Sequence, residues 1–174
     1  MATKLILVRH GETVDNEAHI MQGQTQGKLN AKGIAQAEEL SRELSHEHID
    51  IFMASDLKRA IDTCDIIAKP HNKPVVTTPL LRERDWGGFT GMYIPDLKDK
   101  TWPDDIESLE AMKQRATDFL QLITKKYHGK TVLAVGHGII NKAIQSVFFN
   151  KPMNEIMPMK NVEYRILELS ASTE

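Results

Sequence analysis

The chain has 174 residues, of which 41% are hydrophobic and 26% charged, and its formal net charge is −2 at pH 7. This length and composition fit one domain that buries a proper core. The charge argues against a nucleic-acid partner, which usually requires a basic patch, but allows a positive pocket for a small anion. Cys64 is the only cysteine, which excludes an internal disulfide. Since neither a signal-peptide pattern nor a membrane-spanning apolar run is found, we expect a cytoplasmic protein with no membrane partner.

The first predicted element is a strand over Leu5–Val8, followed directly by Arg9, His10 and Gly11. Its unbroken apolar run is typical of a strand buried on both faces of a parallel sheet. Ligands of such sheets bind outside the carboxyl ends of the strands. A guanidinium beside a histidine at this position indicates a phosphate site at which His10 does the chemistry. Gly11 has no Cβ, so we expect a ligand to approach its backbone closely.

The next two elements are a helix and a second strand. Asn30 is predicted to cap a helix that places Ala37, Leu40 and Leu44 on one face. The run Ile49–Ala54 then predicts the strand.

A third strand follows after another helix. Ser55 is predicted to be the N-cap of this helix, and its apolar stripe holds Cys64 as a packing residue. Prolines at 70 and 74 end the helix, and the β-branched run Val75–Thr78 predicts a short strand.

The segment from Pro79 to Asp105 is irregular and rich in glycine and proline. Long loops inside compact domains are usually functional. We therefore predict a short lid or loop insertion at about residues 84–106.

The remaining patterns complete an alternating order of strands and helices. They predict an amphipathic helix from Leu109 to Ile123, a buried strand over Thr131–Val135, a helix containing Ile140–Val147 and a final, edge strand over Val162–Ile166. The order predicts the α/β class: a three-layer α/β/α sandwich with a mostly parallel, doubly wound sheet, formed by residues 1–174 as a single domain.

Charged and polar side chains follow several of the predicted strands. His137 comes directly after Thr131–Val135 and Gly136, and Arg59 lies at the start of the helix after Ile49–Ala54. Because parallel strands end at one edge of a sheet, we expect His10, His137, Arg9 and Arg59 to converge on one crevice.

This set of residue types suits phosphoryl transfer without a metal. Guanidinium groups bind phosphate oxygens in bidentate fashion, and histidine can form a covalent intermediate. His10 must then be neutral at its attacking nitrogen, whereas a protonated His137 would bind the transferring group. The leaving alkoxide needs a proton, for which Glu83 at the start of the long loop is the candidate.

Several segments in order resemble the histidine phosphatase (phosphoglycerate mutase-like) superfamily. The resemblance covers nearly the whole chain, and several blocks in order are a much stronger signal than one short motif. Its matching segments are Arg9–Thr13 with Asn16, Gln22–Gly23, Leu29–Gly33, Ser55–Ala60, Leu81–Glu83 with Gly87 and Gly91, Gly136–Gly138, and Asn161.

The resemblance implies a phosphoglycerate mutase-like fold and a role for each matching residue. His10 would accept the phosphoryl group and Glu83 would donate the proton, with no cofactor and no metal site. The residues implied to bind the phosphate or the rest of a small phosphorylated substrate are Arg9, Asn16, Gln22, Gly23, Arg59, Arg84, His137 and Gly138.

Departures from the family pattern concern the substrate, not the catalytic set. Trp86 stands where the mutases have tyrosine, and Lys142 stands where an arginine often follows the second histidine. The stretch 92–106 is short and has no arginine, unlike the mutase insertion. A mutase must protect its intermediate from water, so this favours a metal-independent phosphatase, with phosphoglycerate mutase-type transfer on a small phospho-acid as the alternative. A non-catalytic phosphate-binding module is a third hypothesis, which Glu83 disfavours because a binder needs no acid. The oligomeric state stays open.

Overall fold

The computed structural model describes residues 1–170 and contains one five-stranded sheet in the order β3-β2-β4-β1-β5. The strands β1 to β4 run parallel, and β5 pairs antiparallel with β1 at the edge. The strands are β1 (Thr3–Arg9), β2 (Ile51–Ala54), β3 (Val75–Thr77), β4 (Thr131–Gly136) and β5 (Tyr164–Leu169). The helices are α1 (Val14–Ala18), α2 (Ala31–Glu43), α3 (Lys58–Ala68), α4 (Leu109–Lys126) and α5 (Gly138–Phe149).

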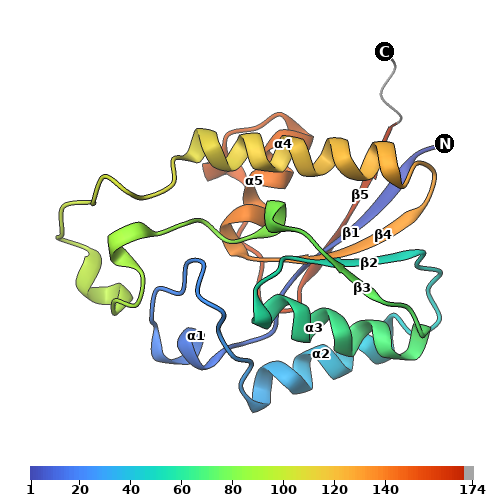
Figure 1. Cartoon of the computed structure of the whole chain (residues 1–174), viewed down its shortest axis with the longest axis horizontal. Helices are drawn as coiled ribbons and strands as arrows, with labels where there is room; N and C mark the ends of the chain where they lie inside the picture. The colour runs from blue at the N-terminus through green and yellow to red at the C-terminus, as the bar shows by residue number, and fades with distance from the viewer. Residues whose placement is uncertain (171–174) are drawn as a thin grey trace.

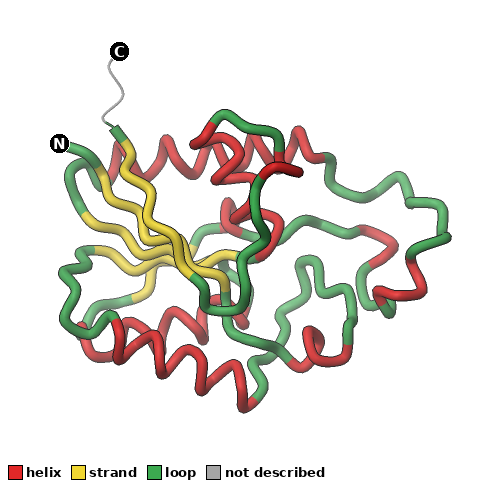
Figure 2. The backbone as a smooth tube through the Cα atoms, turned by 180° about the vertical axis from the view of Figure 1, so that it is seen from behind, coloured by secondary structure: helices red, strands yellow, loops and turns green. Residues whose placement is uncertain are grey.

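The sheet has helices on both faces, which confirms the predicted three-layer α/β/α architecture (Figures 1 and 2). Alternate residues of β1 enter opposite cores, as the period of a strand requires. Leu5 and Leu7 pack in the core beneath α4 and α5, whereas Ile6 and Val8 pack in the core beneath α2 and α3. Both faces of the central strands are therefore covered by apolar contacts, which explains their unbroken apolar sequence.

The predicted elements are all present, with small shifts at their ends. Strand β2 begins at Ile51, two residues later than predicted, and β5 begins at Tyr164. Val162 lies outside β5 because its φ of 54° is left-handed, which an extended strand does not allow. Helix α2 begins as predicted, since the Asn30 side chain accepts the N–H of Gly33 at 2.8 Å.

The predicted N-cap of α3 is wrong. The helix begins at Lys58 with Leu57 as its N-cap, and no side chain caps it. Ser55 lies two residues before that position, and its hydroxyl is bonded to His137 at 2.7 Å and to the N–H of Leu57 at 3.3 Å. Cys64 is buried in the core as predicted, and burial raises the pKa of its thiol.

Residues 84–106 extend away from the sheet beside the loop that follows α1 (Figure 1). Two short 3-10 helices lie in this segment, Gly87–Phe89 and Ile94–Leu97. The backbone of the segment pairs with residues 19–21, because Tyr93 bridges to Ile20 and the N–H of Ile94 donates to His19 O at 2.8 Å. This pairing fixes the predicted lid segment to its neighbouring loop. None of the helices within residues 1–170 has the length and apolarity needed to cross a bilayer.

Candidate active site

The predicted cluster of histidines and arginines forms at the carboxyl ends of the parallel strands. Arg9 is the last residue of β1 and His10 follows it, while His137 follows β4 as the N-cap of α5. Arg59 is the second residue of α3, which follows β2. The His10 and His137 rings lie with centroids 5.0 Å apart. The sheet topology therefore brings together residues that are 128 positions apart in the chain (137 − 9).

The His10 ring is oriented by the backbone of the next residue. Its Nδ1 lies 2.7 Å from Gly11 O, and a carbonyl oxygen only accepts hydrogen bonds. Nδ1 therefore carries the proton, and Nε2 is left with a free lone pair. Burial, followed by the nearby Arg59 charge, lowers the pKa of His10 to about 3. The ring is thus a neutral imidazole near pH 7, as a nucleophile must be.

His137 is fully buried and is oriented by Ser55. The Ser55 hydroxyl lies 2.7 Å from His137 Nε2 and accepts the N–H of Leu57 at 3.3 Å. The hydroxyl can donate to Nε2, and in that arrangement the ring proton of His137 lies on Nδ1. This Nδ1 has no partner among the described residues. Burial, then the Arg59 charge, lowers the pKa of His137 well below its usual value, so the expected protonated form is absent in the ligand-free site.

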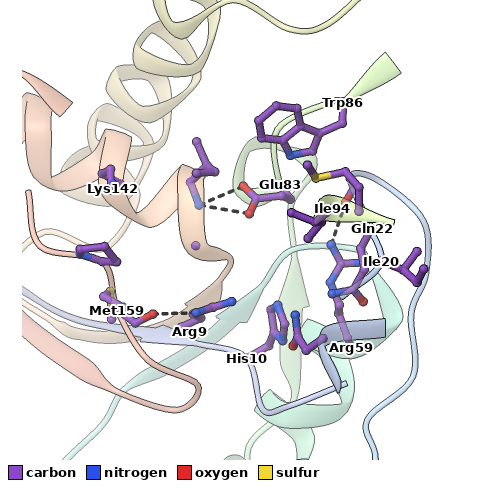
Figure 3. A pocket seen from close by; sticks show the side chains of 16 residues that line it. Arg9, His10, Ile20, Gln22, Arg59, Glu83, Trp86, Ile94, Lys142 and Met159 are labelled. Carbon is purple, nitrogen blue, oxygen red and sulfur yellow. Dashed lines mark hydrogen bonds between the residues drawn. The ribbon is translucent and has the colours of Figure 1, made fainter. Parts of the chain in front are cut away.

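The two arginines are held differently. Arg9 donates one Nη1–H to Met159 O at 2.7 Å, while its Nε has no partner among the described residues (Figure 3). Arg59 donates from Nη2 to Gly23 O at 2.7 Å and from Nη1 to Thr25 O, and its Nε is likewise unpaired in the described part of the chain. Burial lowers the pKa of Arg59 to about 10, so both guanidinium groups stay charged near neutral pH.

Asn16 and Gln22 present amide N–H₂ groups to the cavity because their oxygens are already occupied. The oxygen of Asn16 accepts the N–H of Thr13 at 3.1 Å, and that of Gln22 accepts the Thr13 hydroxyl at 3.0 Å. Both side chains line the cavity that contains His10. Two amide donors in the lining suit an anion, and the role of both residues in binding substrate stays a prediction.

The carboxylate of Glu83 lies at the N-terminus of α5, across the cavity from Arg59 (Figure 3). Its carboxylate accepts the N–H groups of Ile139 and Ile140, at 3.1 Å each, and that of Arg84 at 2.8 Å. The positive end of the helix dipole favours a carboxylate at this position. Glu83 is thereby fixed in the same cavity as His10, where a proton donor is needed.

An arginine of α4 that no sequence pattern singles out supports the segment that carries Glu83. Arg115 donates to the carbonyl groups of Leu80, Arg82 and Glu83 at 2.9, 2.9 and 3.3 Å. It also forms a two-point ion pair with Glu107, at 2.8 and 2.9 Å. Its position on an amphipathic helix resembles that of any solvent-facing arginine, so no sequence signal distinguishes it.

Arg84 is not among the residues that line the cavity, and its role in substrate binding stays a prediction. Its guanidinium carbon lies over the rings of Trp86 at 4.7 Å and Trp102 at 5.4 Å, and its Nε donates to Glu107 O. Cation–π contacts with these two rings hold the side chain away from the cavity. Trp86 itself does line the cavity.

The expectation that a ligand approaches the backbone of Gly11 is corrected. The missing Cβ of Gly11 allows close packing against another part of the chain. A Cβ there would lie 2.6 Å from Gly33 O in α2, which is closer than real Cβ contacts allow. Gly23 and Gly138 both line the cavity, as expected. Asn161 holds the backbone of the nucleophile by donating to His10 O at 3.1 Å.

Comparison with known proteins gives matches over nearly the whole chain. The family model described as "Histidine phosphatase superfamily (branch 1)" matches residues 5–173. The chain is 36% identical to a metal-independent phosphoserine phosphatase of Arabidopsis thaliana over 82% of this chain and 67% of that protein. It is 29% identical to phosphoserine phosphatase 1 of Hydrogenobacter thermophilus, over 95% and 86% of the two chains. A solved structure, Bacillus stearothermophilus YhfR, superposes with a TM-score of 0.87 at 30% identity and covers 99% of this chain and 94% of that one.

Proposed function

Because the chain belongs to the histidine phosphatase superfamily, we propose that it hydrolyses phosphomonoesters through a phosphohistidine on His10. The relative named as a metal-independent phosphoserine phosphatase supports hydrolysis without a metal ion. The observation that carries the proposal is the orientation of His10, whose Nδ1–H is held by Gly11 O so that Nε2 is free to attack. A buried, neutral imidazole beside two guanidinium groups has the charge and geometry that phosphoryl transfer requires.

In the first step, His10 Nε2 attacks the phosphorus atom and the bond from phosphorus to the ester oxygen breaks. Arg9, Arg59 and the free Nδ1–H of His137 stabilise the charge on the phosphoryl oxygens. The departing alkoxide takes a proton from the Glu83 carboxyl group, which must be protonated when the substrate binds.

In the second step, water attacks the phosphorus of phosphohistidine and gives one proton to the Glu83 carboxylate. The nitrogen–phosphorus bond breaks, which returns His10 to its neutral form and releases inorganic phosphate. Glu83 is then protonated again for the next substrate molecule. Acid and base are therefore the same group, acting in opposite directions in the two steps.

Hydrolysis of p-nitrophenyl phosphate in the presence of EDTA tests this proposal. We expect the wild type to retain its activity in EDTA, and His10→Ala to lose at least about 10³-fold in kcat because no other group replaces the nucleophile. His128→Ala, which removes an exposed histidine outside the cavity, is the matched control. Full activity of His10→Ala would contradict the proposal.

Mutase activity is distinguished by the product formed from 3-phosphoglycerate. A hydrolase releases inorganic phosphate, whereas a mutase forms 2-phosphoglycerate at a rate that the bisphosphate stimulates. We expect phosphate release to dominate.

A further inference from the structure

The cavity extends well beyond the groups that bind phosphate. Its volume is about 340 Å³, and His10, Arg9 and Arg59 line only one part of it. The remaining lining residues come from the lid, from the loop after α1, from α5 and from the segment before β5. This outer part is where the leaving group of a phosphomonoester would lie, so its chemistry bears on the substrate.

The outer part of the cavity is largely apolar. The residues that form its walls are Ile20, Trp86, Ile94, Pro158 and Met159. Such walls favour a leaving group with an apolar or aromatic body.

One charged side chain, Lys142, lies among these apolar walls. It is half-buried on α5, across the view of Figure 3 from Arg59 and Ile20. Within residues 1–170, its ammonium group makes neither a hydrogen bond nor an ion pair, and it is the one cation of the lining besides Arg9 and Arg59. A cation that lines a cavity and has no partner among the described residues can pair with an anionic group of a ligand bound there.

The position of Lys142 on α5 directs it toward the phosphate end. It lies four residues after Gly138, on the same helical face and about 6 Å further along the axis. Helical side chains lean toward the N-terminus of their helix, which here is the end that meets Glu83 and Arg9. Glu83 is the one carboxylate in the described lining, and it already accepts backbone N–H groups. The lining therefore contains no free carboxylate that could pair with Lys142, whereas Lys142 is free to pair with an anion.

We infer that Lys142 binds a second anionic group of the substrate, and that the substrate class is a phosphomonoester whose apolar leaving group carries a carboxylate. This inference rests on the proposed phosphatase function and assigns its substrate class. Lys142 determines specificity: it contacts the leaving group and takes no part in the transfer of the phosphoryl group.

Binding of two non-hydrolysable phosphonates tests the inference without requiring turnover. The probes are 3-carboxybenzylphosphonate and 3-carbamoylbenzylphosphonate, which share shape and hydrogen-bonding capacity but differ in the charge of one substituent. Isothermal titration calorimetry on the wild type is expected to show about tenfold tighter binding of the carboxylate probe, as one charge-assisted hydrogen bond provides. Lys142→Met should abolish this preference, and Lys142→Arg should keep it.

Lys151→Met is the matched control, because it removes one positive charge from an exposed position outside the cavity. It should leave the preference at its wild-type value. Equal binding of the two probes by the wild type, or a preference that survives in Lys142→Met, would overturn the inference. Failure of the phosphatase proposal is seen separately, as absence of phenyl phosphate hydrolysis by the wild type.

Discussion

The histidines of the site are neutral because they are buried, and their tautomers follow from one neighbour each. Gly11 O fixes the proton of His10 on Nδ1, and a hydrogen bond donated by the Ser55 hydroxyl to Nε2 leaves that of His137 on Nδ1 as well. The first arrangement leaves a lone pair toward the phosphorus atom, and the second leaves an N–H donor. Two identical side chains thus acquire opposite roles from their hydrogen bonds.

The buried histidines predict a loss of stability in mild acid. Burial lowers the pKa of His10 to about 3 and that of His137 well below its usual value, whereas both titrate near 6.5 in the unfolded chain. The unfolded state therefore binds more protons below pH 6.5, so the free energy of unfolding falls as the pH falls. Each histidine should contribute about 1 kcal/mol of this loss between pH 6 and 5.

Urea unfolding of the wild type and of His10→Gln at these two pH values measures the effect. The variant lacks one of the two titrating groups, so its loss between pH 6 and 5 should be smaller by that one contribution. An identical pH dependence in both proteins would show that His10 is not held neutral by the fold.

The central site residues could be predicted from the sequence because strand ends are readable from apolar runs. Arg9, His10 and His137 each lie within two residues of the end of such a run, and Arg59 lies in the first turn of the helix after another. The direction of Arg84 could not be predicted in the same way. It depends on a contact with Trp102, eighteen positions further along an irregular segment (102 − 84).

At the scale of elements, the segment that carries Glu83 begins with only a short 3-10 helix, Pro79–Leu81, and is held by α4. Arg115 donates to the carbonyl groups of Leu80, Arg82 and Glu83. Glu107 accepts the N–H of Asp85 at 3.0 Å. This explains how a loop residue such as Glu83 keeps a fixed place opposite the nucleophile. Irregular backbone at an active site commonly depends on such support from a rigid element.

Substitution of Arg115 should therefore impair catalysis without contact with the substrate. Arg115→Met leaves three carbonyl groups and the Glu107 carboxylate without their donor, so we expect a stability loss of about 3 kcal/mol. We also expect kcat to fall about tenfold or more, with a smaller change in KM, because Glu83 is displaced from the departing oxygen. Arg115→Lys should restore part of kcat.

Lys125→Met, at an exposed position of the same helix, is the control for both measurements. Thermal unfolding and steady-state kinetics on p-nitrophenyl phosphate read out the two effects. An Arg115→Met protein with unchanged kcat would contradict the supporting role of α4.

The type and order of the elements could be predicted from periodicity, whereas several of their ends could not. Strand β5 starts after Val162 because that residue turns into a left-handed conformation to bond Arg9 O at 2.9 Å. Helix α3 starts three residues after Ser55, whose hydroxyl bonds His137 in a distant part of the chain. Both boundaries depend on contacts between distant parts of the chain, to which a local pattern gives no access.

At the scale of the whole molecule, the two apolar cores share the strands between them. Strand β1 contributes Leu5 and Leu7 to one core and Ile6 and Val8 to the other, so neither core persists when the sheet opens. This arrangement predicts that the chain unfolds as the single domain expected from its length, in one cooperative transition. Calorimetry should show one peak whose calorimetric and van't Hoff enthalpies agree. Two separable transitions would contradict it.

The active site combines parts of the two helix layers, since α3 supplies Arg59 and α5 supplies the N–H groups that hold Glu83. The sheet edge between them carries the nucleophile. The account as a whole therefore depends on covalent transfer to His10, which one experiment observes directly.

The transfer is measured by quenching the wild type rapidly, without acid, during turnover of a ³²P-labelled phosphomonoester. Peptide mapping then locates the label. The account predicts a label that is stable in base and labile in acid, located on the peptide that contains His10, and absent from His10→Asn. A label on another residue, or full turnover by His10→Asn, would contradict it.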